Sequence, residues 1–153
     1  MAEAAAVCFE DRSHASGVVI GVSCVDSKQF AIYWSAVTDQ HRRTYNDLPE
    51  ATEMGATGVA ILIVRAVTGK KAIERSKKGT GFDYWVGDTD DDELIFSNKA
   101  RLEVSGILNG TDTEIAGRLK KKNAQVQITD HLGVPAYVAI IEFGQPKAHL
   151  EMK

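Results

Sequence analysis

The sequence predicts a mixed α/β (α+β) fold in a single domain, and three observations on its 153 residues support this class. The length suits one domain, and 44% hydrophobic with 25% charged residues is the balance of an ordinary globular chain. Runs rich in β-branched and aromatic residues alternate with two longer segments that begin at helix-capping residues. The order is hairpin, helix, three strands, helix and strand, which predicts a mixed sheet flanked by two helices.

Residues 17–36 predict a β-hairpin at the N-terminal side of the domain. The runs SGVVIGVSC and KQFAIYWSA are both β-rich, and Val25-Asp26-Ser27 makes a short turn between them. The second run alternates between two sets of residues, as a strand with one better-buried face does.

The segment DLPEATEMGATGVAILIVRAVTG predicts the first helix of the core. Asp47 is the expected N-cap, Glu50 completes a capping box three residues later, and Gly69 is the expected stop at the C-terminal end. Gly55 and Gly58 lower the helix propensity, so we expect this helix to pack closely against another element.

Three strands, a second helix and a last strand follow. KAIER, FDYWV and LIFSNKARLEVSGI predict strands, and the acidic run between Asp88 and Glu93 is expected to be an exposed hairpin connection. Thr111 and Glu114 repeat the capping-box spacing at the start of EIAGRLKKKNAQV. The last apolar run, AYVAIIEF, is expected to be a buried strand, so that residues 47–143 form the core of the domain.

Charge and hydropathy argue against several classes of protein. The formal net charge of −3 gives no general attraction to nucleic acid or anionic membranes, so such contacts need a local basic patch. The longest apolar run, GVAILIV, is far below the roughly 20 residues of a membrane helix, so no membrane association is expected. The N-terminus lacks a basic region before its apolar stretch, so no signal peptide is expected. With Cys8 and Cys24 too few for a disulfide framework, a cytoplasmic protein is favoured.

Two strand-like segments each carry one acid in apolar company, Asp83 in FDYWV and Glu103 in RLEVS. Period-two alternation puts one polar set on a single face of the second strand, comprising Lys99, Arg101, Glu103 and Ser105. If the two strands pair, Asp83 and Glu103 come within reach of one divalent ion, and hard oxygen ligands suit Mg²⁺ or Mn²⁺. Glu50 and Glu53 share a helix face and can add a third carboxylate. The alternative is a half-exposed sheet whose polar faces simply meet solvent.

This order of helix with Glu, strand, strand with Asp, strand with Glu, helix and strand resembles the PD-(D/E)XK nuclease superfamily over residues 47–143. Glu53 (or Glu50), Asp83 and EVS at 103–105 take the places of the helix acid, the strand Asp and the acid-x-Lys motif. The resemblance implies a restriction-endonuclease-like fold, with the hairpin as an addition, and Mg²⁺- or Mn²⁺-dependent hydrolysis of phosphodiesters in nucleic acid. It implies that Asp83, Glu103 and the carbonyl of Val104 bind metal, and that Glu53 orients water or binds a second ion.

The chain departs from that superfamily at the motif lysine, whose place is taken by Ser105. Lys99, on the same strand face as Glu103, or Lys122, on the following helix with Arg118 and Gln125, would have to supply the positive charge. If neither does, the chain is a catalytically inactive domain of the same fold that serves as a protein-interaction or regulatory partner. A small-molecule hydrolase using the same carboxylates is a third interpretation.

Two basic clusters flank the acids, KKAIERSKK (70–78) and RLKKK (118–122). Phosphate binding needs only local charge, so the resemblance makes one set of residues candidates for nucleic-acid contact: Lys77, Lys78, Arg118 and Lys121. The alternative is that these runs only keep the surface soluble. Members of the superfamily often dimerise, so a homodimer is a further expectation.

Overall fold

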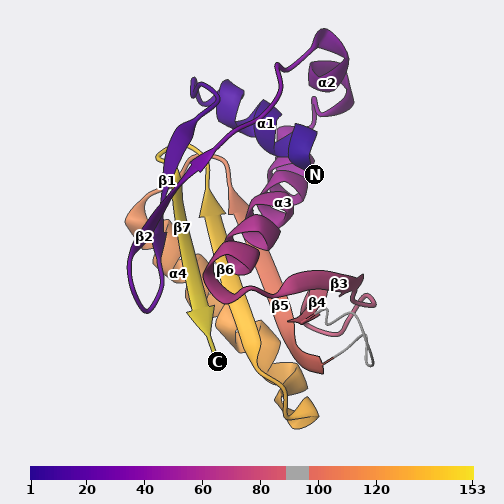
Figure 1. Cartoon of the computed structure of the whole chain (residues 1–153). Helices are drawn as coiled ribbons and strands as arrows, with labels where there is room; N and C mark the ends of the chain where they lie inside the picture. Colours follow the sequence, from indigo (N-terminus) through magenta and orange to yellow (C-terminus); the bar gives the residue numbers. More distant parts are fainter. Residues whose placement is uncertain (89–96) are drawn as a thin grey trace.

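A computed structural model of the chain, which describes residues 1–88 and 97–153, has a mixed α/β architecture (Figure 1). The described residues form seven strands in one mixed sheet, in the order β2-β1-β7-β6-β5-β4-β3. The strands are β1 (Val18–Ser23), β2 (Lys28–Ile32), β3 (Lys71–Arg75), β4 (Tyr84–Asp88), β5 (Ser97–Ile107), β6 (Ala136–Glu142) and β7 (Lys147–Met152). The predicted fold class, α+β with a mixed sheet, is confirmed at this level.

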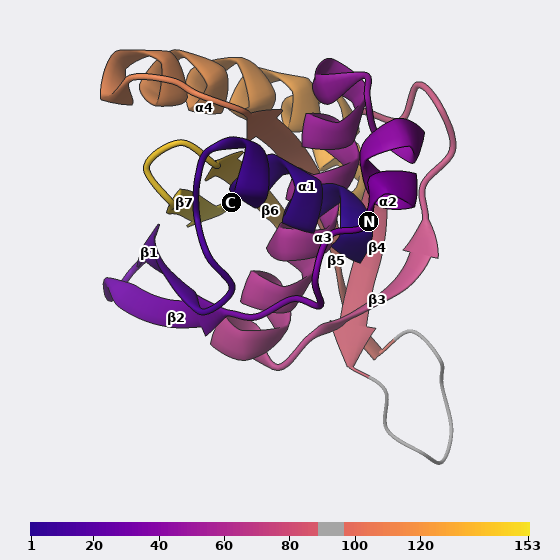
Figure 2. The same ribbon diagram turned by 90° about the horizontal axis from the view of Figure 1, so that it is seen from above.

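The helices lie on both faces of the sheet. They are α1 (Ala2–Asp11), α2 (Asp39–Thr44), α3 (Leu48–Thr68) and α4 (Asp112–Val126), which runs on into the 3₁₀ helix η1 (Gln127–Leu132). Seen from above, α3 packs on one face and α4 on the other (Figure 2), while α1 packs against α3. The core accordingly has two parts, a large one between α3 and the sheet and a smaller one under α4.

The α3 helix begins and ends as its sequence predicts. Asp47 is the N-cap and accepts a hydrogen bond from the amide of Glu50 at 3.1 Å, which is one half of the expected capping box. Gly69 ends the helix in the left-handed conformation, at φ 79°. The expected close packing occurs at Gly55, where a Cβ atom would lie 2.8 Å from the backbone of Ala5. The element that the helix glycines accommodate is therefore α1.

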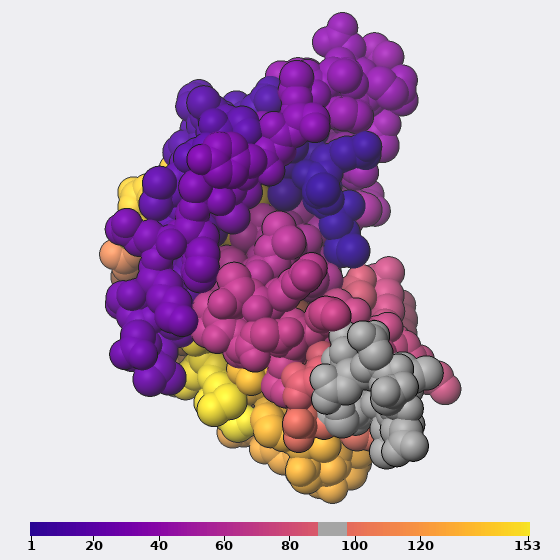
Figure 3. Space-filling model, in the orientation of Figure 1, coloured from indigo at the N-terminus to yellow at the C-terminus, as the bar shows by residue number. Residues whose placement is uncertain are grey.

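Among the described residues, α3 is one helix whose length and composition would allow it to cross a membrane. Its apolar stripe is instead buried between the sheet and α1. A core helix of a soluble protein passes the same test, so the arrangement is compatible with a soluble protein. Figure 3 shows that the N-terminal residues, in indigo and purple, cover one end of α3 while other parts of it reach the surface.

The sheet pairing joins the predicted hairpin to the predicted core. The strands β3, β4 and β5 are antiparallel, and β5 and β6 are parallel. At the other end β1 and β2 form the expected antiparallel hairpin. Between the two parts lies β7, antiparallel to β6 and parallel to β1, which the sequence analysis did not predict.

Several other elements were not predicted from the sequence, namely α1, α2 and η1. The most consequential is α1, whose residues Ala4–Phe9 are buried in the core although the analysis treated the N-terminus only as a test for a signal peptide. The strand β4 begins at Tyr84, two residues later than FDYWV suggested. The acidic run expected to be an exposed connection lies, except for Asp88, outside the described residues.

Candidate metal and nucleic-acid site

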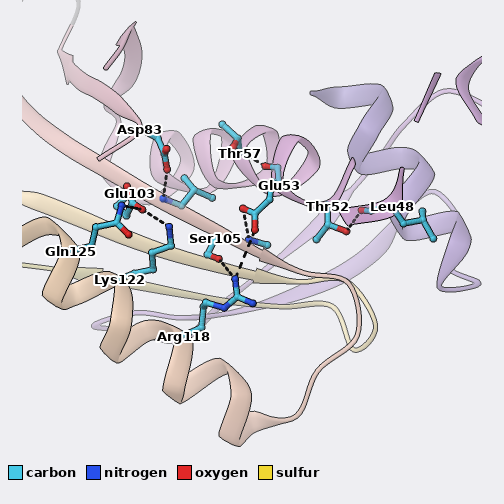
Figure 4. Close-up of polar contacts among 12 residues, drawn as sticks. Leu48, Thr52, Glu53, Thr57, Asp83, Glu103, Ser105, Arg118, Lys122 and Gln125 are labelled. Atoms are coloured by element: carbon cyan, nitrogen blue, oxygen red, sulfur yellow. Dashed lines mark hydrogen bonds and ion pairs between the residues drawn. The ribbon is translucent and has the colours of Figure 1, made fainter. Parts of the chain in front are cut away.

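The register between β4 and β5 places Asp83 beside Glu103. Tyr84 pairs with Leu102 and Trp85 with Arg101, so the next position outward is Asp83 opposite Glu103. The amide of Asp83 donates to the carbonyl of Leu102 at 2.8 Å, which continues the ladder one residue beyond β4. The two acids from neighbouring strands therefore lie side by side, as expected (Figure 4).

Both faces of β5 are buried at this point. The apolar set, Ala100, Leu102 and Val104, belongs to the core under α3. The opposite set is equally buried, with Arg101 3%, Glu103 1% and Ser105 0% exposed, since α4 covers it. A solvated polar face, the alternative considered for this strand, is therefore wrong for Arg101, Glu103 and Ser105, whereas Lys99 of the same set is exposed.

The α4 helix packs over β5, and two of its basic residues contact two polar residues of that strand. Lys122 donates to Oε1 of Glu103 at 2.5 Å, and Arg118 donates to Oγ of Ser105 at 2.9 Å. One helical turn rises about 5.4 Å, and two strand residues span about 6.6 Å, so helix positions four apart face strand positions two apart. The helix thus places two cations on two successive positions of the strand face.

The two carboxylate oxygens of Glu103 have different surroundings. Oε1 accepts from Lys122 and, at 2.9 Å, from the amide of Gln125, whereas the buried Oε2 has no hydrogen-bond partner among the described residues. Burial raises the pKa of Glu103 to about 7; the hydrogen bond from Lys122 opposes this shift, whereas the charge of Asp83 and a hydrogen bond between the two carboxyl groups, which forms when Glu103 is protonated, add to it. A buried carboxylate oxygen without a partner is unfavourable unless a proton or cation meets it.

Asp83 is held by the backbone of the neighbouring strand. Its Oδ2 accepts from the amide of Val104 at 2.8 Å. Val104 therefore contacts the site through its N–H group, whereas the resemblance implied a role for its carbonyl. This hydrogen bond fixes the Asp83 side chain toward β5 and on the same side as Glu103 (Figure 4).

Glu53 reaches β5 further along the strand. Its Oε2 accepts from the amide of Gly106 at 3.4 Å, and its Oε1 lies 3.8 Å from Nη1 of Arg118. The close approach depends on Gly106, because a Cβ atom there would lie 2.6 Å from the carbonyl oxygen of Thr52. Of the two helix acids considered, Glu53 is the one that contacts the strand, while the amide of Glu50 serves the N-cap.

Asp83 and Glu103, but not Glu53, line a cleft of about 630 Å³ between the β3–β4 connection and the end of α4. Its lining consists of Arg75, Ser76, Lys77, Lys78, Gly79, Gly81, Phe82, Asp83, Glu103, Gln125 and Ile128. Two of the residues predicted to contact nucleic acid, Lys77 and Lys78, are thus beside the acids. Arg118 instead binds Ser105 and Glu53, and Lys121 is exposed on α4 outside this lining.

The two lysines considered as replacements for the motif lysine differ in position. Lys122 contacts Glu103, as described above. The ammonium of Lys99 lies 5.2 Å from the centroid of the Trp85 ring, in a cation–π contact. The structure therefore favours Lys122 over Lys99 as the cation of this site.

The residues present fit a divalent cation with few protein ligands. Asp83 and Glu103 offer carboxylate oxygens, and the partnerless Oε2 is the atom best placed to gain from a cation. Within residues 1–88 and 97–153, no group of three or more His, Cys, Asp or Glu side chains is arranged to hold a metal. Two carboxylates with the remaining positions left to water or substrate are a pattern typical of Mg²⁺.

Neither the comparison with protein-family models nor those with curated proteins and solved structures finds a match for this chain. Function is therefore inferred below from the residues and geometry of the site. From the sequence, Gln125 was expected only to lie near Lys122, and the contact of Arg118 with Ser105 was not predicted. Both contacts could have been predicted from the helical spacing of Arg118, Lys122 and Gln125, because this spacing places the three residues on one face of α4.

Proposed function

We propose that this chain is a metal-dependent nuclease that hydrolyses phosphodiesters in nucleic acid. The observation that carries the proposal is the buried Glu103, whose Oε2 has no partner among the described residues and lies beside Asp83 in an open cleft. An acid kept in such a place is unfavourable for folding, which points to a functional reason for its presence.

The order of elements supports a restriction-endonuclease-like fold and the resemblance to the PD-(D/E)XK nuclease superfamily. The helix α3 with Glu53 precedes three antiparallel strands, and α4 then leads to β6, parallel to β5. Asp83 adjoins β4 and Glu103 lies within β5, as the resemblance implies. The α1 helix, the hairpin and β7 are additions to that core.

Each residue of the site has a role in this proposal. Asp83 and Glu103 would hold Mg²⁺ or Mn²⁺, which when bound acts as a Lewis acid toward the phosphate. Lys122, which is bound to Glu103, would supply positive charge where negative charge develops on the phosphate oxygens. Gln125 holds the Glu103 carboxylate in its orientation. Glu53 contacts Gly106 and Arg118 outside the lining of the cleft, so it would orient the attacking water only after leaving these contacts.

The second candidate is an inactive domain of the same fold that binds a protein partner or a second copy of itself. It is favoured by Ser105, which stands where the motif lysine would be and is fully buried under Arg118. It is also favoured by the two donors already bound to Oε1 of Glu103. Either function fits the cytoplasm, since both cysteines are free thiols.

A cleavage assay on single- and double-stranded DNA and RNA, with Mg²⁺ or Mn²⁺, tests the proposal. We expect Asp83→Asn, Glu103→Gln and Lys122→Met each to lower the rate by roughly 100-fold or more, because the first two remove charged ligands of the metal and the third removes a cation that would stabilise the phosphate. Lys120→Met, an equal change of charge at an exposed position of α4, should cleave as the wild type does. Unaltered cleavage by Asp83→Asn would overturn the assignment, and a stable protein complex without any cleavage would support the second candidate.

A further inference from the structure

One side of the cleft is formed by three basic residues, Arg75, Lys77 and Lys78, which we call the basic wall. Binding of a metal ion alone would not require these residues. Arg75, Lys77 and Lys78, at the end of β3 and in the connection to β4, line the cleft opposite Gln125 and Ile128. A volume of about 630 Å³ is within the range of sites that enclose a whole organic ligand, and far exceeds a hydrated ion.

Within residues 1–88 and 97–153, no ion pair neutralises the charges of this wall. The ion pairs between described residues use other cations: Arg12, His41, Arg42, Lys70, Arg101, Arg118, Lys122 and Lys147. Arg75, Lys77 and Lys78 therefore present three positive charges within four residues, next to the two acids. Such a group is suited to a ligand that carries several negative charges along its length.

Hydrogen bonds hold the basic wall at a fixed place relative to the acids. The amide of Ser76 donates to the carbonyl of Asp83 at 2.7 Å, and Oγ1 of Thr80 donates to the carbonyl of Lys77 at 2.8 Å. Gly81 lies against α4, where a Cβ atom would come within 2.8 Å of the carbonyl oxygen of Gln125. The connection is thus tied both to the strand that carries Asp83 and to the helix that carries Lys122.

The aromatic ring of the lining and the amide NH2 of Gln125 already contact other parts of the protein. Its aromatic residue, Phe82, is buried and packs edge-on against Trp85 at 4.7 Å between ring centroids, so it presents no stacking surface. The amide of Gln125 is bound to Glu103. Opposite the basic wall lies Ile128, which is 65% exposed and makes no base-specific hydrogen bond.

We propose that Arg75, Lys77 and Lys78 bind the phosphodiester backbone on one side of the scissile phosphate, so that the substrate is a polynucleotide recognised without base preference. This inference rests on the proposed nuclease function, which it deepens by naming the substrate class. Backbone phosphates supply affinity and position, whereas contacts to base edges supply sequence specificity, and a cluster of three cations is suited to the first kind.

The test measures binding without metal, so that no cleavage takes place. Fluorescence anisotropy in EDTA would compare single-stranded DNA, single-stranded RNA and duplex DNA, each as several unrelated sequences, over a range of salt concentrations. We expect affinities within a few-fold across sequences of one type. Lys77→Ala/Lys78→Ala should weaken binding at least about 10-fold and reduce the slope of log Kd against log salt by about 1.4 to 1.8. Lys28→Ala/Lys153→Ala, which removes the same charge at exposed positions outside the cleft, should leave both unchanged.

Three results would overturn the inference: no binding by the wild type, a strong preference for one sequence, or equal salt slopes for Lys77→Ala/Lys78→Ala and the wild type. A second assay separates its failure from failure of the proposed function. Metal-dependent hydrolysis of bis(p-nitrophenyl) phosphate without polynucleotide binding would support the proposed catalytic site and contradict phosphate binding by the basic wall. Polynucleotide binding with the predicted salt slope but no hydrolysis would support phosphate binding by the basic wall and contradict the proposed catalytic site.

Discussion

The ammonium of Lys122 lies 2.5 Å from Oε1 of Glu103, and this contact joins α4 to β5 beside the cleft that Glu103 lines. It compensates part of the cost of burying the carboxylate, because an ion pair in a poorly solvated place is stronger than one at the surface. It also leaves Oε2 turned away from the lysine and without a partner among the described residues. Fold stability and the proposed chemistry therefore depend on the same carboxylate.

The burial of Glu103 predicts a pH dependence of stability for the metal-free protein. Its pKa is raised from 4.5 to about 7, so the folded state holds this proton more tightly than the unfolded state does. The free energy of unfolding should then fall as the pH rises from about 4.5 to 7, by at most roughly 3 kcal/mol from this group. Urea unfolding at several pH values in EDTA, for the wild type and Glu103→Gln, measures the difference.

In that experiment Glu103→Gln should lack the decrease between pH 4.5 and 7 that the wild type shows. Glu50→Gln, a change of the same chemistry at an exposed residue of α3, should keep the wild-type slope. If Glu103→Gln and the wild type have parallel profiles, Glu103 does not carry a raised pKa.

Restoring the motif lysine should damage the protein. Ser105 is fully buried and accepts a hydrogen bond from Arg118, and Lys122 lies one helical turn away on the same face of α4. Ser105→Lys would bury a larger side chain and a third cation, so we expect a destabilisation of about 3 kcal/mol or more and no gain in cleavage. Thermal unfolding and the cleavage assay together check this, and a stable, more active Ser105→Lys variant would contradict it.

Ser105→Thr is the matched control for that change. It adds volume at the same buried position but no charge, and it retains a hydroxyl group for Arg118. We expect it to cost less stability than Ser105→Lys, so that the difference between the variants isolates the effect of the added cation.

Two helix glycines should respond in opposite ways to alanine. At Gly55 a Cβ atom would lie 2.8 Å from the backbone of Ala5, whereas at Gly117 in α4 no atom lies within 4 Å of it. Gly55→Ala should destabilise the protein by about 1 to 3 kcal/mol, because α1 has to move. Gly117→Ala should stabilise it by up to about 1 kcal/mol through helix propensity. Equal midpoints for the two variants in urea unfolding would show that α1 does not pack on α3 as described.

We expect Gln125 to increase the metal affinity of the site, because its hydrogen bond orients the Glu103 carboxylate. It donates to the oxygen that Lys122 also binds, and such outer partners of a ligand typically contribute 10- to 100-fold in metal affinity. Gln125→Leu is expected to weaken Mn²⁺ binding by about that factor, as measured by calorimetry. Gln127→Leu, at an exposed position two residues later, should bind as the wild type does.

The core of the fold could be predicted because its local signals are strong. Asp47 and Gly69 mark the ends of α3, Thr111 and Glu114 form the capping box of α4, and the buried run 136–142 reads as a strand. The missed β7 has a weaker signal. Its sequence KAHLEM mixes polar and apolar residues, and it becomes a strand because β6 and β1 pair with it on both sides.

The candidate site could be predicted only in part. Alternation along a strand places Glu103 and Ser105 on one face, but alternation does not say whether that face meets solvent or a helix. The burial of this face depends on where α4 packs, which is a tertiary property of the chain. The same holds for Lys122 and Lys99, because the sequence does not distinguish a lysine that contacts Glu103 from one that lies on Trp85.

Calorimetric titration with Mg²⁺ and Mn²⁺ tests the central claim, that Asp83 and Glu103 form a metal site, most directly. The comparison is between the wild type, Asp83→Asn/Glu103→Gln, and Asp26→Asn/Glu50→Gln, which removes the same charges at exposed positions. The account predicts binding by the wild type and the exposed-site control, and loss of binding in Asp83→Asn/Glu103→Gln. Absence of binding by the wild type, or equal binding by all three proteins, would contradict it.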